Sequence, residues 1–591
     1  MRFLAVPGAS RLSAAPSRAA LAVRLAQAGL TCVTDEEDLL LFADASLPLL
    51  RLPGARGAVL GHVFAGDRRL DDLSPHQVDI SESGGRWLVE RCWGRYVAFV
   101  LAGPGRRLRV LRDPSGGLSC YRVGDRRAPV FCSDLATALA AGLPRPAIDW
   151  RSVAHDLLYR RVRGARTSLV EVDELLPGLT WASDPPGGAT ELAWDPWSHA
   201  AAGRRLNSPA QAADLLRQEV VRCVGALGAA FPRLTLELSG GLDSSIVAMG
   251  LAGHQGALAV NCVSPGPEGD ERDYARAAAA AARLELEERV LGTAGFDPAA
   301  APTPCLARPG RPMVLRSAHD AVLDHVARHG SHAVFNGAGG DSLFCALNTA
   351  APVVDRFRTE GPSLGVLRTI GDVAALHGCS IWTVARLAWR SRRRPFDAAK
   401  GADAAFLRAE ALPAALDLHP WLAAAPPDAS LARLRHLAAI TFIQGYIEGQ
   451  GRSSTLPTVA PLLAQPLLEL CLRIPTWEWM SGGRDRAIAR LAFAGRAPDA
   501  VIYRRSKGAI DHFVIALFEA GRAQIRMLLL DGLLAQNGVI DVPAVAAALD
   551  RPEHLRARDA HRLLDLADAE AWARSWAIPP APVRATAAPT S

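Results

Sequence analysis

The stretch that most constrains the fold is LELSGGLDSSIVA, residues 236–248, in which an apolar strand pattern runs through a glycine turn directly into a helix pattern. The same alternation repeats nearby. ALAVNCVS and HAVFNGAGGDSLF are typical of strands, while SPAQAADLLRQEVVRCVGALG and ERDYARAAAAAARLEL have helical periodicity. Strands that alternate with helices favour a parallel sheet covered on both faces. The chain from residue 208 onward is therefore expected to form an α/β domain.

The glycine turn also has the composition of an anion-binding loop. Gly240 and Gly241 let backbone N–H groups approach a ligand without a Cβ clash, and the helix that follows begins with partial positive charge. The surrounding hydroxyl donors are Ser239, Ser244 and Ser245. Asp243 would repel a phosphate unless a cation lay between them, so we expect Mg²⁺ there. On these residues alone, an ordinary glycine turn with a Ser/Asp cap is equally open.

The first 180 residues have a different pattern, in which short apolar runs are separated by Gly, Pro and Asp. GAVLGHVFAG, GRYVAFVLAG, RRLRVLRDPSGG and APVFCSD are typical of strands joined by turns. A passage rich in Pro, Gly and Trp follows, and the pattern after residue 350 is mainly helical. We expect a first domain over residues 1–180, a linker over 181–207, an α/β domain over 208–530, C-terminal helices over 531–577 and a disordered tail over 578–591.

Composition limits the class of protein. The net charge of +6 is small for 591 residues, which fits an anionic ligand such as a nucleotide without requiring nucleic acid. The ten cysteines have no metal-binding spacing and are expected to be reduced thiols in a cytoplasmic protein. No apolar run is long enough to cross a bilayer. Only two of the 66 Lys and Arg residues are lysines, Lys400 and Lys507, so a lysine beside Arg504 and Arg505 is unusual in this chain.

Five segments in a fixed order make the chain resemble the asparagine synthetase family. SGGLDS resembles the phosphate loop of ATP pyrophosphatases, GPEGDERDYARAAA the family's DE-x-x-x-A helix start, and FNGAGGDSLF its second glycine signature. TVAPLLAQPLLELC resembles its P-[FL]-[LV] segment, and GRDRAIARLAF with APDAVIYRRSKGA resembles its closing arginine and lysine signature. The resemblance covers roughly residues 208 to 520. It implies a parallel-sheet ATP pyrophosphatase domain (adenine nucleotide alpha hydrolase-like) with extra helices.

The resemblance also implies ATP and Mg²⁺ as cofactors and cleavage of ATP between the α- and β-phosphates. The implied catalytic residues are Asp243 and Asp341, which would bind Mg²⁺, and Lys507, whose compact ammonium would follow charge at the reaction centre. The implied nucleotide-binding residues are Leu238, Ser239, Gly240, Gly241, Asp243, Ser244, Ser245, Val263, Gly337 and Lys507. Ser342 stands where many relatives carry Glu, which would thin the second metal shell.

The first domain resembles the glutaminase domain of that family but lacks its nucleophile. Glutamine-dependent members carry a catalytic cysteine directly after the initiator Met, whereas this chain begins Met1-Arg2-Phe3 and its first cysteine is Cys32. Residues 112–121 still match the domain's RD-x-x-G-x-x-x-x-Y turn, and DELLPGLT resembles its final L-x-P-G strand. We expect a degenerate Ntn-type α+β sandwich that does not hydrolyse glutamine, so that the amine comes from elsewhere.

One subgroup resembles this combination, the lasso peptide macrolactam synthetases, or cyclases. Their RDPSG-x-x-x-CY turn is similar to residues 112–121, although a good β-turn alone would explain RDPSG, and their W-x-PW passage is similar to residues 194–197. The resemblance implies an AMP-forming ligase that adenylates an Asp or Glu side chain of a precursor peptide and closes an isopeptide ring with the peptide's N-terminal amine. The expected partners are that peptide, the leader-peptide-binding protein and the leader protease, with no nucleic acid and no membrane.

Two other functions stay open from the sequence. An ammonia-dependent asparagine synthetase would share the first half-reaction but would need a small charged pocket in place of a broad groove. A non-catalytic scaffold would have no need for Asp243, Asp341 and Lys507 together. A β-lactam synthetase is disfavoured because CALNTAAPVV, after the second glycine signature, contains no tyrosine.

Two further runs invite a functional and an ordinary interpretation. Tyr446 and Glu448 are expected on a passage from helix to loop that faces the substrate, although helix packing is slightly favoured for Tyr446. The arginines at 390 and 392–394 are expected to be solvated surface, and contact with an acidic peptide or partner protein is the alternative.

Overall fold

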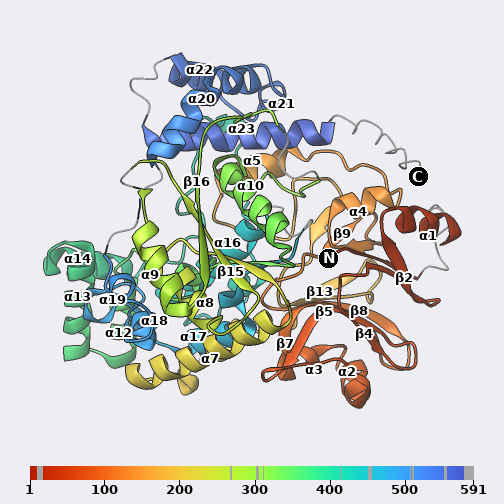
Figure 1. Ribbon diagram of the computed structural model, residues 1–591, viewed down its shortest axis with the longest axis horizontal. Helices are drawn as coiled ribbons and strands as arrows, with labels where there is room; N and C mark the ends of the chain where they lie inside the picture. The colour runs from red at the N-terminus through yellow and green to blue at the C-terminus, as the bar shows by residue number, and fades with distance from the viewer. Residues whose placement is uncertain are drawn as a thin grey trace.

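The fold is taken from a computed structural model of the 591-residue chain (Figure 1). The structure describes residues 1–8, 18–266, 269–300, 305–310, 312–413, 415–449, 456–505, 508, 511–550 and 556–577. The expected tail over 578–591 lies outside these residues. Among the described helices, none combines the length and the apolar character that a bilayer crossing requires.

The N-terminal domain contains two antiparallel sheets. The first sheet has the order β11-β9-β10-β1-β3-β2 and the second the order β13-β12-β8-β7-β5-β4, with β6 paired to β5. The strands of the first sheet are β1 Phe3–Pro7, β2 Leu30–Asp35, β3 Leu39–Asp44, β9 Tyr121–Val123, β10 Val130–Cys132 and β11 Val172–Glu174. Those of the second are β4 Leu49–Leu52, β5 Gly57–Ala65, β6 Arg68–Arg69, β7 Trp93–Ala102, β8 Arg107–Arg112, β12 Leu179–Ala182 and β13 Ala189–Leu192. The helices of this part are α1 Arg18–Gln27, α2 Gln77–Glu82, α3 Arg86–Arg91, α4 Leu135–Ala140, α5 Trp150–Leu158 and α6 Pro196–Ala200.

Strand β7 shows how the two halves of the chain are joined. Side chains alternate across a strand, and one face of β7, with Val97 and Phe99, packs in the core between the two sheets. The other face, with Tyr96 and Ala98, belongs to an apolar core that continues into the parallel sheet at Phe335. The second sheet is therefore buried on both faces, and the N-terminal and C-terminal halves share one core.

The C-terminal half is built on a five-stranded parallel sheet with the order β16-β15-β14-β17-β18. Its strands are β14 Leu234–Glu237, β15 Ala257–Val263, β16 Glu285–Val290, β17 Val334–Phe335 and β18 Thr458–Val459. Its helices include α7 Pro209–Ala229, α8 Leu242–Gly250, α9 Arg272–Ala282, α10 Pro312–His329 and α11 Gly340–Leu343. The Ser208 hydroxyl accepts the Gln211 N–H and so caps α7, as the sequence predicts.

The remaining chain is helical and adds two outlying groups (Figure 1). Helices α12–α14 form one group at one edge of the molecule, and α20–α23 form another beside α5 of the N-terminal domain. The helices are α12 Ala351–Glu360, α13 Leu364–His377, α14 Ile381–Ser391, α15 Pro420–Ala423, α16 Leu431–Glu448, α17 Gln465–Arg473, α18 Ala487–Phe493, α19 Asp499–Ile502, α20 Asp511–Leu530, α21 Leu533–Gln536, α22 Val542–Asp550 and α23 Ala557–Ala577.

The predicted fold class, an antiparallel α+β sandwich followed by a parallel-sheet domain with extra helices, is confirmed. The predicted domain boundaries stay a prediction, but the segment 181–207 is more ordered than a linker. It carries β13, which pairs with β12, and α6, whose Asp195 side chain accepts the Trp197 N–H. The pairing of β13 completes the second sheet and explains why so many glycines and prolines occur there: they form the hairpin before it.

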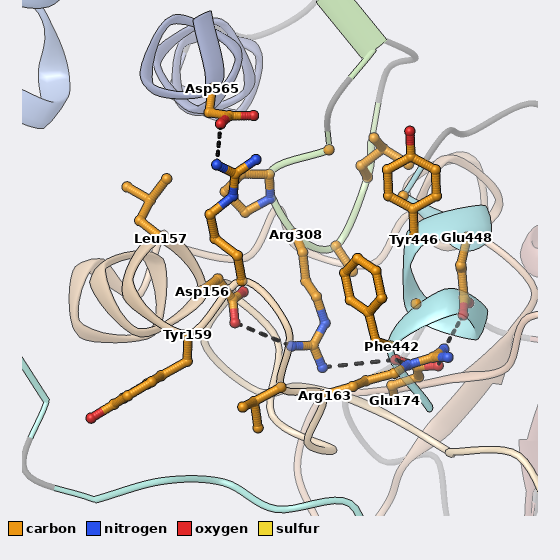
Figure 2. Close-up of a pocket in the computed structure, with 18 of the residues that line it drawn as sticks. Asp156, Leu157, Tyr159, Arg163, Glu174, Arg308, Phe442, Tyr446, Glu448 and Asp565 are labelled. Carbon is orange, nitrogen blue, oxygen red and sulfur yellow. Dashed lines mark hydrogen bonds and ion pairs between the residues drawn. The ribbon is translucent and has the colours of Figure 1, made fainter. Parts of the chain in front are cut away.

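A buried ion cluster lies where the two halves of the chain meet. Arg112 is fully buried, and its Nη1 lies 2.7 Å from Glu174 Oε1 while its Nη2 lies 3.3 Å from Glu448 Oε2. Arg163 pairs with both glutamates, as Figure 2 shows. The Tyr121 hydroxyl donates to Glu448 Oε1 over 2.9 Å. Burial alone would raise the pKa of Glu448, but Arg112 and Arg163 hold that pKa well below its usual range.

This cluster predicts a large effect from removing one charge. Arg112→Met should lower the free energy of unfolding by about 3–5 kcal/mol, because it removes one of the arginines that neutralise the buried Glu174 and Glu448. The matched control is Arg109→Met on the same strand, where the arginine pairs at the surface with Asp184 and Glu191 and the loss should be about 0–1 kcal/mol. Urea denaturation of the two variants measures the difference. Equal losses would show that the cluster is no more stabilising than a surface pair.

Candidate active site

The glycine turn Ser239–Gly240–Gly241 leaves the carboxyl end of β14 and opens α8. Gly240 has φ +77°, and a Cβ there would lie 2.6 Å from the Ala275 nitrogen of α9. Glycine is therefore required, both for the left-handed backbone and for the contact with α9. The Ser239 and Ser244 hydroxyls lie 3.1 Å apart, and the Gly241 N–H donates to Ser239 Oγ. The turn is thus a compact loop whose donors gather at a helix N-terminus, as the sequence predicts for a phosphate site.

A second glycine loop packs directly on the first. It follows β17 and leads into α11, whose first turn carries Asp341. A Cβ on Gly337 would lie 2.5 Å from the Ser244 nitrogen, and a Cβ on Gly340 would lie 2.3 Å from Cγ of Asp243. Real Cβ atoms do not come so close to other heavy atoms, so only glycine permits this approach. The approach brings the first turns of α8 and α11, and with them Asp243 and Asp341, to one place.

Arg486, the residue before α18, lies between these two carboxylates. Its Nη1 is 3.2 Å and 3.1 Å from the two oxygens of Asp243 and also pairs with Asp341. Burial alone would lower the pKa of Arg486, but Asp243 and Asp341 raise it above its ordinary value. The guanidinium therefore stands where the two carboxylates need a cation. Two converging carboxylates are also the donor set that Mg²⁺ prefers, so these residues fit the expected metal.

Buried polar side chains of α16 support the C-terminal end of α11. His436 of α16 is fully buried, and its Nε2 lies 2.9 Å from the Leu343 carbonyl oxygen. Its Nδ1 lies 2.8 Å from Arg433 Nη1, so it accepts and Nε2 donates. Burial and Arg433 lower the pKa of His436 to about 3, which keeps the imidazole neutral at physiological pH. The contact with Leu343 holds the end of α11, the helix that carries Asp341, and the contact with Arg433 fixes the orientation of the His436 ring.

Lys507 lies outside the described residues, but its described neighbours are placed. Glu271, just before α9, accepts the Gly508 N–H over 2.8 Å and pairs with Arg504 over 2.5 Å. The Arg504 guanidinium also lies 3.9 Å from the ring centre of Tyr274. Tyr274 and Ala275 are the residues on which Gly240 packs. The residues on both sides of Ser506–Lys507 are therefore tied to the helix that supports the phosphate loop.

The other predicted nucleotide-binding residues lie at the same edge of the sheet. Leu238 continues β14 and donates its N–H to the Val260 carbonyl of β15, and Val263 ends β15. Ser245 is fully buried in the first turns of α8 and its hydroxyl has no partner among the described residues. Strand β14 has β15 on one side and β17 on the other, so the strand order reverses there. Ligands of open parallel sheets bind in the crevice outside the carboxyl ends of the strands at such a point.

A second group of metal-type side chains does not compete with this site. Glu287 on β16 faces His325 and His329, which lie one helical turn apart on α10. The same carboxylate already pairs with Arg328 over 2.8 Å and Arg289 over 2.7 Å. The two guanidinium groups neutralise the carboxylate and oppose a further cation.

Two cavities lie on the other side of the ion cluster. The smaller, about 130 Å³, is lined by Phe442 and Tyr446 of α16 and by Arg308 (Figure 2). Glu448 also lines it, but its carboxylate is bound by arginines and Tyr121, so it is not the open substrate-facing group that the sequence suggested. The larger, about 1080 Å³, lies between β13, α5 and the 410–420 segment.

Comparison with known proteins agrees with this arrangement. The profile of asparagine synthase matches residues 215–574, which is more than half of the chain. The chain belongs to the asparagine synthase family. Members of this family are ATP-dependent ligases that form carbon–nitrogen bonds, so the chain is an ATP-dependent amide-forming ligase in the general sense.

Other comparisons add less. One of 37 matching chains of solved structures is titled "Structure of the allosteric regulatory enzyme of purine biosynthesis". It is 10% identical, covers 51% of this chain and 82% of that chain, and has a TM-score of 0.22, at which the likeness carries no argument. No curated protein matches the chain significantly.

The contact between the two glycine loops predicts that Gly340→Ala abolishes most ATP turnover. The added methyl must displace Asp243 from its place beside Asp341, and misplacement of a reacting group by about 1 Å can cost roughly a hundredfold. Gly371→Ala in α13 is the matched control, because a Cβ there meets nothing within 4 Å, and it should leave turnover unchanged. Nucleotide turnover of both variants, each checked for folding by circular dichroism, measures this. Near-native turnover of Gly340→Ala would contradict the geometry.

Proposed function

We propose that this enzyme closes a macrolactam ring in a peptide, as the lasso peptide cyclases do. The single observation that carries the proposal is the pairing of two touching glycine loops, which bring Asp243 and Asp341 together, with an N-terminal domain whose cysteines offer no activated nucleophile. Of the ten cysteines, Cys32 alone is exposed, and it lies on β2. Burial and the nearby Asp35 raise the pKa of its thiol, which disfavours the thiolate. We infer that the attacking amine is not ammonia released from glutamine.

The proposed reaction has two steps. A carboxylate oxygen of a substrate Asp or Glu side chain attacks the α-phosphorus of ATP, and the bond to pyrophosphate breaks. The peptide's N-terminal amine then attacks the acyl carbon, the bond to AMP breaks, and one proton leaves the nitrogen. The turn 239–241 and the start of α8 would hold phosphate oxygens. Lys507 would stabilise charge that develops on oxygen in both steps.

Asp243 and Asp341 would hold Mg²⁺, which when bound shields the negative charge of the pyrophosphate. Their present partner Arg486 is tied at its other end to Asp485, with Nε 2.7 Å from Asp485 Oδ2. Asp485 also pairs with Arg490 of α18 over 2.7 Å. We propose that Arg486 neutralises the two carboxylates before the nucleotide binds and then turns toward a phosphate oxygen.

The motifs that resemble those of the cyclases hold the N-terminal domain against α16 of the C-terminal half, which supports a structural role for this domain. Arg112 and Tyr121, at the two ends of the RDPSG-containing turn, both contact Glu448 of α16. The side-chain amide of Gln444, one turn earlier, donates to the carbonyl oxygens of Pro114 and Ser115. Arg95 donates to the Thr458 carbonyl oxygen of β18 over 2.7 Å. The retained turn thus holds the end of α16, and Arg95 of β7 holds β18.

The W-x-PW passage, residues 194–197, also connects the N-terminal domain to the C-terminal half. The Trp194 indole donates to Glu469 of α17 over 3.0 Å, and the Trp197 indole donates to the Trp421 carbonyl oxygen over 2.7 Å. Both tryptophans therefore connect the end of the second sheet to the helices of the C-terminal half. This function needs no glutamine chemistry, which gives a reason for a glutaminase-like domain to persist without its nucleophile.

The size of the larger cavity favours a peptide over a single amino acid. Its volume of about 1080 Å³ is at the top of the range for small-molecule sites. Its wall includes Trp181, Leu412 and the edge strand β13, whose outer side is unpaired among the described strands. We propose that an extended segment of the substrate peptide lies there, while its acceptor carboxylate reaches the nucleotide.

The proposal predicts AMP, pyrophosphate and a peptide that has lost one water. The test is incubation with ATP, Mg²⁺ and candidate precursor peptides with free N-termini, followed by mass spectrometry of the peptide and chromatography of the nucleotide. Stoichiometric AMP and dehydrated peptide are expected. ADP with orthophosphate would contradict the reaction type. Asparagine formed from aspartate and ammonium, without any cyclised peptide, would contradict the substrate.

A second prediction concerns Lys507. Lys507→Arg keeps the charge, but a planar fork cannot replace a compact ammonium in a confined site. Both Lys507→Arg and Lys507→Ala should therefore lose about a hundredfold or more of turnover, the scale of removing one preorganised oxyanion donor. Nucleotide affinity should fall much less, because the backbone donors of the phosphate loop remain. Lys400→Arg is the control for the only other lysine. Native turnover of Lys507→Arg would show that charge alone suffices.

A further inference from the structure

We propose that the outer side of α14 binds the surface of an anionic lipid bilayer. The residues concerned are Trp382, Arg386, Trp389 and Arg390 of α14 and the exposed Arg393 and Arg394 just after it, which together we call the α14 surface. Leu364 and Leu367 lie in the neighbouring helix α13 and are also exposed. Helices α12–α14 stand at one edge of the molecule, away from the N-terminal domain (Figure 1).

Side chains of opposite character occupy the two sides of α14. Val384 and Ala388, four residues apart, are buried in the small core of α12–α14. Trp382, Arg386 and Trp389, at i, i+4 and i+7, form a stripe on the other side. Trp382 is 78% exposed and Trp389 65% exposed. Soluble surfaces do carry scattered apolar residues, but two tryptophans exposed to this extent on one stripe mark an interaction site.

The charge of this region has one sign. From Val373 to Phe396 the sequence contains five arginines, residues 386, 390, 392, 393 and 394, and no Asp or Glu. Within the described part of the chain, none of the five forms an ion pair with a carboxylate. Arg392 instead stacks on the Trp389 ring, with its guanidinium carbon 3.2 Å from the ring centre. The partner of the α14 surface must therefore be anionic. A second copy of this chain is disfavoured as the partner, because its arginines would repel those of the first.

Tryptophan and arginine in one stripe match the headgroup layer of a bilayer. Indole rings prefer that layer, and arginines there reach lipid phosphates while their stems cover apolar surface. Clusters of four to eight basic residues on an amphipathic helix are typical of anionic-lipid binding. An acidic protein would instead have to offer a pocket for each indole and a carboxylate for each arginine.

A peripheral contact of this kind requires no membrane-spanning segment. The sequence predicts no membrane partner, because no apolar run is long enough to cross a bilayer. That argument does not apply to a helix that lies on the bilayer surface. The arginines at 390 and 392–394 were expected to be solvated. Their place beside two exposed tryptophans, rather than their number, indicates a ligand.

Vesicle sedimentation of the full chain tests the proposal. The probes are neutral phosphatidylcholine vesicles and vesicles with about one third anionic phosphatidylglycerol. Binding is expected to the anionic vesicles only, to weaken as salt rises, and to shift tryptophan fluorescence to shorter wavelength. The Trp382→Ala/Trp389→Ala double variant and the Arg390→Gln/Arg393→Gln/Arg394→Gln triple variant should each bind about tenfold more weakly or worse.

The matched control removes three exposed arginines elsewhere, with the triple variant Arg68→Gln/Arg107→Gln/Arg127→Gln in the N-terminal domain. It should bind within about threefold of the native chain, because it lowers the net charge equally without touching α14. No binding to anionic vesicles, equal loss in the control, or unchanged binding of the tryptophan variant would each overturn the proposal. A protein ligand held by this surface in the absence of vesicle binding would also overturn it. Vesicle binding and ligase turnover are separate measurements, so failure of one proposal is distinguishable from failure of the other.

Discussion

Two ionised carboxylates that face one another in a partly enclosed site repel each other unless a cation lies between them, and this constraint organises the C-terminal half of the enzyme. Asp243 and Asp341 begin two different helices on two neighbouring strands of the parallel sheet. Glycines at 337 and 340 let the loops touch, and Arg486 supplies the cation. Each of these features would be unfavourable alone. Together they bring two carboxylates and one guanidinium to the same place at the carboxyl ends of neighbouring strands.

The N-terminal domain is joined to this site by charge as well as by apolar packing. Its second sheet shares a core with the parallel sheet, and its RDPSG turn places Arg112 against Glu448 at the end of α16. A buried charge that loses its partner is costly, so the two halves must keep their relative position. The N-terminal domain is thereby tied to α16 of the half that carries the two glycine loops, and this contact gives the domain a structural role.

The sequence predicted the parts of the fold whose signals are local. Ser208 marked the start of α7, the glycine turn marked the junction of β14 and α8, and the short apolar run GRYVAFVLAG marked strand β7. The sequence did not predict strand β16, because its residues ELEERV are mostly charged. Its strand conformation depends on pairing with β15, which lies elsewhere in the sequence. Strand β18 has only two residues and is defined by its pairing with β17. The position of Arg486 could not be predicted either, because its contacts with Asp243 and Asp341 join residues far apart in the sequence.

We propose that a substrate carboxylate is adenylated at the site of Asp243 and Asp341, and transfer of an oxygen isotope distinguishes this reaction from attack at the γ-phosphate. A substrate peptide with oxygen-18 in its acceptor carboxylate would be turned over with ATP, and the nucleotide and phosphate products would be analysed by mass spectrometry. Adenylation places one carboxylate oxygen on the α-phosphorus, so the label should appear in AMP, and pyrophosphate should contain none. Label in orthophosphate, with ADP as the other product, would mean attack at the γ-phosphate and would contradict the account.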